Sequence, residues 1–236
     1  MTNQEVDIQR IYYANNAGKY DSMHLYQKGE HFLALSILAG MVDFLEVNSV
    51  LDVGAGTGRA MLYLKEHSSI LKIKGVEPIA ELRNIGYQKG ISPENLIDGN
   101  ALKLPFADDE FDLVCEFGVL HHIKTPSIAV SEMLRVARKA VFISDSNRFG
   151  QGSLLNRFVK STSYAMGLWP LLNSIKTRGK GYIITEGDGL SYSYSVFDDY
   201  NIVRDQCRQV HFLNTQDAEK NIYHTAGHVV MIGIKE

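Results

Sequence analysis

The segment Val50–Gly58 combines residue types that could hold a charged small molecule. It is an apolar run containing Asp52, followed by a glycine at every second position: Gly54, Gly56 and Gly58. Glycines let the backbone approach a ligand closely, and a helix beginning after them directs free N–H groups at it. The Asp52 carboxylate suits a cationic ligand better than a pyrophosphate. Arg59 stands where a dinucleotide fingerprint would place another glycine, so the pattern disfavours that class.

Two further groups could bind a ligand or move a proton. Glu77 follows an apolar run, and an ionised carboxylate there can accept hydrogen bonds from two adjacent hydroxyls. His121 and His122 follow the run 111–117. A histidine with an ordinary pKa near ~6.5 can accept a proton at neutral pH, so His121 is the candidate general base. The alternative is that both histidines only pack or hydrogen-bond locally.

Alternating elements must position these residues. Strands are predicted at 49–53, 72–76, 111–117 and 140–144, with helices at 58–67, 79–89 and 127–137 between them. This alternation predicts a doubly wound, mostly parallel α/β sheet with right-handed crossovers. The loops that begin at Gly54, Glu77, Phe117 and Asp145 should then meet at the carboxyl edge, where such sheets bind ligands.

We expect one domain with four parts. Residues 1–46 form N-terminal helices that act as a lid, and 47–148 form the core that binds the cofactor. Residues 149–195 interrupt the alternation as a helical insertion that caps the substrate site, and 196–236 supply an antiparallel pair of edge strands, 209–215 and 227–234. A chain of 236 residues suits this arrangement.

Composition excludes several classes. The net charge of -3 argues against a protein that grips nucleic acid over its whole surface. Cys115 and Cys207 show no metal-binding spacing, so neither a metal site nor a disulfide framework is expected. The N-terminus has no apolar signal core, and no run is long enough to span a bilayer. The sequence therefore predicts a cytoplasmic protein.

Val50–Gly58 resembles motif I of the class I S-adenosylmethionine-dependent methyltransferases, which have a Rossmann-like fold. Three other segments resemble the same family in order: Gly75–Pro78, Asn100–Phe106 with Phe111–Val114, and Val119–His122. Together they lie within residues 49–145. The resemblance implies that the chain is an enzyme and that S-adenosyl-L-methionine is its cofactor.

The resemblance also implies a set of contacts. Glu77 would take the ribose hydroxyls, and Asn100 would face the adenine edge through an amide where many members carry aspartate. The expected cofactor-binding residues are Asp52, Gly54, Ala55, Gly56, Gly58, Glu77, Pro78, Asn100, Ala101, Leu102, Glu116, Phe117 and Tyr20. The expected substrate residues are His24, His122, Asp145, Asn147 and Arg148. Tyr12 and Tyr13, with Tyr20, could form part of a lid.

The insertion suggests the substrate. Six basic residues and no acidic one lie between Asp145 and Glu186: Arg148, Arg157, Lys160, Lys176, Arg178 and Lys180. A basic, aromatic cap suits a small anionic acceptor such as a phosphorylated metabolite, nucleotide-sugar or glycan precursor. A solvated cationic face is the plainer interpretation. A third interpretation is that the stretch lies on a membrane surface, but the stretch is short, which disfavours this.

Three functions remain open. We favour methyl transfer to an oxygen or nitrogen of such an acceptor. An RNA methyltransferase is the alternative, although nucleic acid is an unlikely partner for a chain with this net charge and without an Asn/Asp-Pro-Pro-aromatic motif after residue 111. A cofactor-binding module without catalytic activity is the third.

Overall fold

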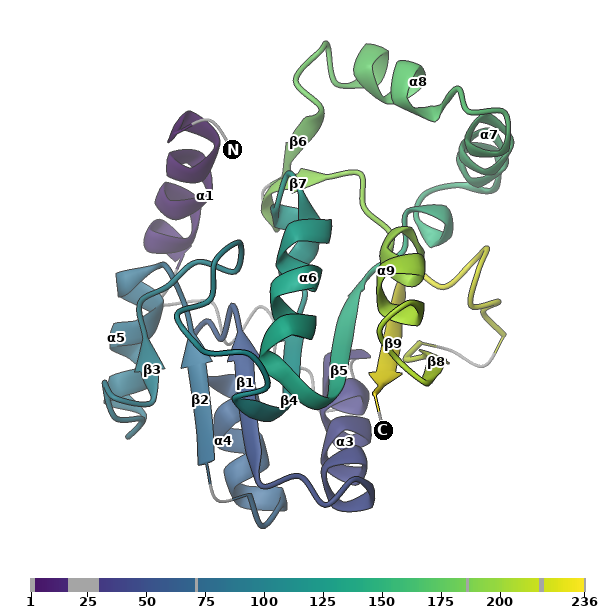
Figure 1. Cartoon of the computed structure of the whole chain (residues 1–236). Coiled ribbons are helices and arrows are strands. Elements are labelled where there is room, and N and C mark those ends of the chain that lie inside the picture. The colour runs from purple at the N-terminus through teal and green to yellow at the C-terminus, as the bar shows by residue number, and fades with distance from the viewer. Residues whose placement is uncertain (1–2, 17–29, 71, 186, 217–218, 236) are drawn as a thin grey trace.

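The computed structural model describes residues 3–16, 30–70, 72–185, 187–216 and 219–235. A seven-stranded sheet runs through its centre in the order β3-β2-β1-β4-β5-β9-β8 (Figure 1). The strands are β1 Ser49–Val53, β2 Lys72–Val76, β3 Leu96–Ile97, β4 Phe111–Phe117, β5 Ala137–Ser146, β8 Gln209–Asn214 and β9 His228–Ile234. Strands β1 to β5 pair in parallel, and β9 pairs antiparallel with both β5 and β8. The predicted fold class and the antiparallel edge pair are confirmed.

The sheet alternates its side chains between two apolar layers, because successive residues of a strand point to opposite faces. In β4, Val114 belongs to the core beneath α6 (Pro126–Val136) and α9 (Tyr200–Arg204), and Leu113 belongs to the opposite one. That opposite core packs against α3 (Glu30–Phe44) and α4 (Arg59–His67).

Among the described residues, the other helices of the sheet region are α1 (Asn3–Asn16) and α5 (Ala80–Gln88), which pack against each other. Short 3-10 turns lie at Leu120–His122, Arg148–Gly150 and Val196–Asp199. Because β1, β2, β4 and β5 are parallel, their carboxyl ends open at one edge of the sheet, the edge toward which α1 lies (Figure 1).

The interruption after β5 folds as a helical pair and a hairpin. It contains α7 (Leu154–Ala165), α8 (Trp169–Lys176), and the antiparallel strands β6 (Tyr182–Thr185) and β7 (Gly189–Tyr192). We call residues 153–192 the cap. Figure 1 shows α7 and α8 standing apart from the sheet, with the hairpin between them and α1. Among the described helices, none is long and apolar enough to cross a membrane.

Candidate functional site

The turn after β1 can be made only with glycine. Gly54, Gly56 and Gly58 all have positive φ, at 71°, 57° and 78°, which L side chains rarely adopt. A Cβ at Gly54 would lie 2.4 Å from Val119 Cγ2, and one at Gly58 would lie 2.0 Å from Ile91 Cδ1. The turn is therefore packed closely from behind. Gly58 is the N-cap of α4, so the free N–H groups of that helix begin here.

Glu77 closes this turn from the end of β2. Its Oε2 accepts a hydrogen bond from Gly56 N and its Oε1 from Ile79 N, each at 2.9 Å. Each carboxylate oxygen keeps a second lone pair for a ligand hydroxyl. Burial raises the pKa of Glu77 to about 7, although these N–H donors lower it. A charged side chain at the end of a strand would be expected to face solvent. Only 4% of Glu77 is exposed, because its carboxylate is hydrogen-bonded to the turn.

Asp52 places a second carboxylate beside the turn. It is 3% exposed, and burial raises its pKa to about 7 even though Arg59 lowers it. Its nearby donor is the weak Cys115 Sγ, at 4.0 Å. A buried carboxylate with so little hydrogen bonding is costly as an anion. A cationic ligand would offset that cost.

The other predicted cofactor contacts fall into two groups. Ala55 is buried in the turn, whereas Pro78 and Asn100 are exposed on the loops that follow β2 and β3. Asn100 Oδ1 accepts from Leu102 N at 2.9 Å. Ala101 and Leu102 pack against the core. Because β1, β2 and β3 are parallel, the loops that follow them lie at the same strand edge, and the contact of these residues with a cofactor stays a prediction.

Glu116 and Phe117 are built into the protein interior. Glu116 is fully buried, and its two oxygens accept hydrogen bonds from Val119 N and Ser144 N, both at 2.9 Å. Phe117 packs against Phe142 in the core. The geometry gives Glu116 the role of holding β4 to β5, and its contact with a cofactor stays a prediction. Tyr20 and His24 lie outside the described residues.

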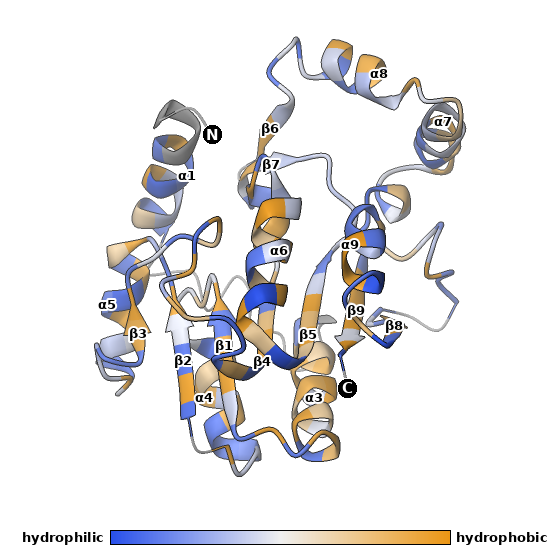
Figure 2. Cartoon of the chain, in the orientation of Figure 1, coloured by the Kyte–Doolittle hydropathy of each residue, from blue (hydrophilic) through white to orange (hydrophobic). Residues whose placement is uncertain are grey.

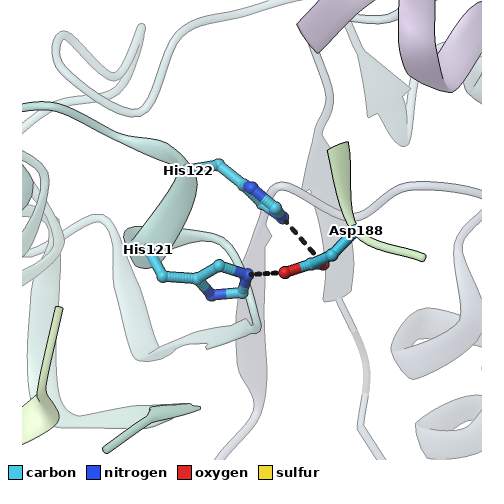
Figure 3. A group of neighbouring side chains, drawn as sticks. All are labelled: His121, His122 and Asp188. Carbon is cyan, nitrogen blue, oxygen red and sulfur yellow. Dashed lines mark hydrogen bonds and ion pairs between the residues drawn. The ribbon is translucent and has the colours of Figure 1, made fainter. Parts of the chain in front are cut away.

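His121 lies between two carboxylates at the carboxyl edge. Its Nδ1–H donates to Asp145 Oδ1 at 2.6 Å, and its Nε2 lies 3.1 Å from Asp188 Oδ2 (Figure 3). Burial lowers the pKa of His121, but the two carboxylates outweigh it and hold that pKa well above its ordinary value. The pKa of Asp145 is correspondingly low, since His121 more than cancels the effect of burial. His121 is therefore an imidazolium while Asp188 faces it.

His122 stays neutral in the same cluster. Its Nδ1–H donates to Leu190 O at 2.7 Å, and Tyr13 OH lies 2.9 Å from its Nε2. Burial and the charge of His121 lower its pKa to about 4. The Tyr13 contact joins α1 to the turn after β4, and the role of α1 as a lid stays a prediction. Gln9 of the same helix accepts from Leu190 N at 2.6 Å, which ties α1 to β7.

The donors of His121, His122 and Asp188 lie within 4.8 Å of one another, close enough for one metal ion. The imidazolium of His121 already pairs with both Asp145 and Asp188, and these three side chains together carry one net negative charge. We interpret the group as an ion-pair cluster. Asp188 belongs to the turn before β7 and lies 67 residues beyond His121, so sequence reasoning gave no signal for it.

Asn147 differs from expectation, whereas Arg148 lies at the cavity wall. Asn147 is fully buried: its amide donates to Ala226 O at 2.9 Å, and its Oδ1 accepts from Ser195 Oγ at 3.0 Å. Its hydrogen-bonding groups anchor the base of the cap, so the geometry does not support contact with a substrate. Arg148 pairs with Asp198 and stacks near two aromatic rings, yet it also lines a cavity.

That cavity, of about 210 Å³, lies between the cap and the carboxyl edge. His121 and Asp188 line it, and so do three cations: Arg148, Lys160 and Lys176. Lys160 Nζ donates to the Arg148 and Gln151 carbonyls. Burial lowers the pKa of Lys160, and the charges of Lys176 and Arg148 lower it further. The cavity therefore concentrates positive charge beside the histidine cluster.

Comparisons with known proteins point to one family. A model described as a methyltransferase domain matches residues 51–143. The chain is 32% identical over 128 residues to a demethylmenaquinone methyltransferase of Porphyromonas gingivalis, covering 51% of this chain and 52% of that protein. It is 36% identical over 90 residues to the human probable tRNA methyltransferase 9B, covering 37% of this chain and 18% of that protein. The chain spans about half the length of the first three curated relatives that it matches.

Solved structures share the fold at greater length. A Thermotoga maritima protein described as an S-adenosylmethionine-dependent methyltransferase, possibly a histamine N-methyltransferase, aligns with a TM-score of 0.59 and 21% identity over 96% of this chain and 99% of its own. The magnesium protoporphyrin IX methyltransferase of Synechocystis, solved with S-adenosylhomocysteine, aligns with a TM-score of 0.61 and 14% identity over 98% of this chain and all of its own.

Proposed function

Since the chain belongs to the class I S-adenosylmethionine-dependent methyltransferases, we propose that it methylates an oxygen or nitrogen of a small anionic acceptor. The observation that carries the proposal is the pairing of two sites at one strand edge. One is the glycine turn with its two buried carboxylates, and the other is the cationic cavity that begins at His121.

The cofactor side fits the residues present. The positive-φ turn leaves no room for side chains behind it and exposes the first N–H groups of α4 toward a ligand. Glu77 would accept the ribose hydroxyls, and Asp52 would balance the positive charge of the methionine end. Bound there, S-adenosylmethionine supplies both the methyl group and its leaving group. The protein's task is then to orient the acceptor.

The acceptor side favours an anion. Three cations line a cavity of about 210 Å³, and burial together with the charges of Lys176 and Arg148 lowers the pKa of Lys160. A phosphate or carboxylate bound among them would accept hydrogen bonds from these cations. The small volume suits one group of a metabolite, a nucleotide-sugar or the head group of a larger molecule.

The proton of a hydroxyl acceptor would pass to His121. Asp145 orients this ring by holding its Nδ1–H, so Nε2 is the atom that faces the cavity. For Nε2 to act as a base, Asp188 must first move away, which lowers the pKa of His121, and the Nε2 proton must leave to solvent; the neutral Nε2 can then accept the proton of the hydroxyl. Asp188 is a half-exposed residue on the turn before β7, where such a movement is open to it.

An RNA acceptor is the weaker candidate, although one relative is named as a probable tRNA methyltransferase. RNA would need a continuous basic track along the surface. Three of the six basic residues of the insertion line a cavity instead, and the net charge of the chain is -3. A module that binds the cofactor without catalysis would have no use for the ion-paired histidine at the cavity wall.

Isotope transfer tests the proposal. The protein is incubated with S-adenosylmethionine carrying a trideuterated methyl group and a panel of phosphorylated, nucleotide-linked and carboxylate acceptors, and mass spectrometry follows the label. Label in an anionic small molecule, together with S-adenosylhomocysteine, would support it. Label appearing only in added tRNA, or only in neutral acceptors, would overturn the acceptor class.

A further inference from the structure

The two helices of the cap turn their apolar faces to solvent. On α7 the exposed residues follow helical spacing, and Phe158 is 69% exposed. On α8 and the turn before it the same spacing recurs, and Leu171 is 61% exposed. The exposed apolar residues are Leu154, Leu155, Phe158, Val159, Met166, Leu168, Leu171, Leu172 and Ile175. We call this set the outer face of the cap.

The opposite faces of the same helices are polar. Lys160 on α7 and Asn173, Lys176 and Thr177 on and after α8 line the cavity, and Trp169 is the apolar residue among them. A helix of a globular protein normally buries its apolar stripe and exposes its polar one. Here the arrangement is reversed. The polar inner faces line the cavity, so much of the apolar outer face is left in contact with solvent.

Both helices are regular and have ordinary N-terminal signals. The exposed apolar stripe therefore belongs to well-formed helices. Ser153 caps α7 by accepting from Asn156 N, and Pro170 occupies the first turn of α8. Figure 2 shows apolar residues recurring along α8 and the turn that joins it to α7. Contiguous exposed apolar surface of this kind marks an interaction site.

Charge selects the occupant. The six basic residues of the insertion are unaccompanied by any acid over residues 146–185, and Lys176, Arg178 and Lys180 are exposed beside the end of α8. A second copy of the chain would bring the same cations against these, which disfavours self-association. A bilayer containing anionic lipids offers both an apolar interior for the outer face and negative head groups for its basic margin.

We propose that the outer face of the cap docks on the surface of an anionic lipid bilayer. Leucine, phenylalanine and methionine side chains enter the boundary between head groups and acyl chains, and Arg178 and Lys180 lie among the head groups. The cavity then opens behind the docked helices. This docking depends on the outer face and its basic margin, and it holds whether or not the proposed methyl transfer is correct.

Vesicle binding of the whole chain tests it. With vesicles of phosphatidylglycerol and phosphatidylcholine, the protein should co-sediment. Binding should weaken with vesicles of phosphatidylcholine alone and with rising salt, because exposed charges are screened.

A matched pair of variants isolates the outer face. Phe158→Glu with Leu171→Glu should lower vesicle partitioning at least about tenfold, since both side chains are exposed and would carry charge into the lipid boundary. Phe44→Glu with Ile128→Glu makes the same charge change at exposed apolar positions on α3 and α6, and should leave partitioning within about twofold. Circular dichroism confirms that both variants fold.

Three results would overturn the proposal. The first is wild-type protein that binds neither kind of vesicle. The second is equal partitioning of the two double variants. The third is a dimer that Phe158→Glu with Leu171→Glu abolishes, in protein that ignores vesicles, because the outer face would then be an interface between copies.

Discussion

The affinity for S-adenosylmethionine should depend steeply on pH because of the two carboxylates at the glycine turn. Burial raises the pKa of both Asp52 and Glu77 to about 7 in the free protein. A ligand that brings positive charge to Asp52 and hydroxyl donors to Glu77 binds their ionised forms. Below pH 7 these groups hold protons that binding must expel. Affinity therefore rises with pH through this window and levels off above it.

The magnitude follows from the ionised fractions. With a pKa of about 7, roughly 3% of a carboxylate is ionised at pH 5.5 and roughly 75% at pH 7.5. Each carboxylate that must ionise thus weakens binding about 25-fold over that interval, equivalent to ~2 kcal/mol. If both must ionise, the two factors multiply.

Isothermal titration calorimetry from pH 5.5 to 7.5 measures this, and repeating it in buffers of different ionisation enthalpy counts the protons released. Glu77→Gln should bind S-adenosylmethionine more weakly at every pH in this range. Its affinity should also change less with pH, because only Asp52 then has to ionise. Glu66→Gln, at an exposed carboxylate on α4, is the control and should follow the wild type. Affinity that is flat across this range, with no protons released, would refute the reasoning.

Three further predictions concern the turn, the histidine and the cavity. Gly54→Ala should cost ~1–3 kcal/mol in thermal unfolding, because its φ is 71° and a Cβ meets Val119; unchanged stability would contradict the packing described. Asp188→Asn should move the acidic limb of the rate profile to lower pH, since the imidazolium of His121 loses a partner and must be neutral to act; an unmoved limb would remove His121 as the base. Lys176→Glu should raise KM for an anionic acceptor about three- to tenfold, whereas Lys180→Glu, off the cavity wall, should not. Equal effects of the two variants would mean that the cap attracts anions only through its overall charge, and would contradict binding in the cavity.

Local spacing made the sheet and the cofactor side predictable. Each strand end is followed within a few residues by its loop, so the alternation alone placed Gly54, Glu77 and Asp145 at one edge. Strand β3, only Leu96–Ile97, was too short to leave a pattern. Strand β5 extends to Ala137–Ser146, beyond the predicted 140–144, because pairing with both neighbours continues past the apolar run.

Long-range contacts explain what could not be predicted. Asp188 reaches His121 only because the β6–β7 hairpin folds back over the strand edge. The amide of Asn147 is used in hydrogen bonds to backbone carbonyls near residue 226. The periodicity of α7 revealed an apolar stripe but not its direction. An apolar stripe that faces the core and one that faces solvent give the same pattern in the sequence. The position of Lys160 on the cavity wall shows that the stripe of α7 faces solvent.

The central claim is that the glycine turn and its carboxylates form a site for S-adenosylmethionine. Calorimetry of the purified protein at pH 7.5 with S-adenosylmethionine, S-adenosylhomocysteine and a nicotinamide dinucleotide tests it most directly. We predict dissociation constants in the micromolar range for the first two, ~-7 to -9 kcal/mol, and no heat for the third. Binding of the dinucleotide without binding of either sulfur compound would contradict the account.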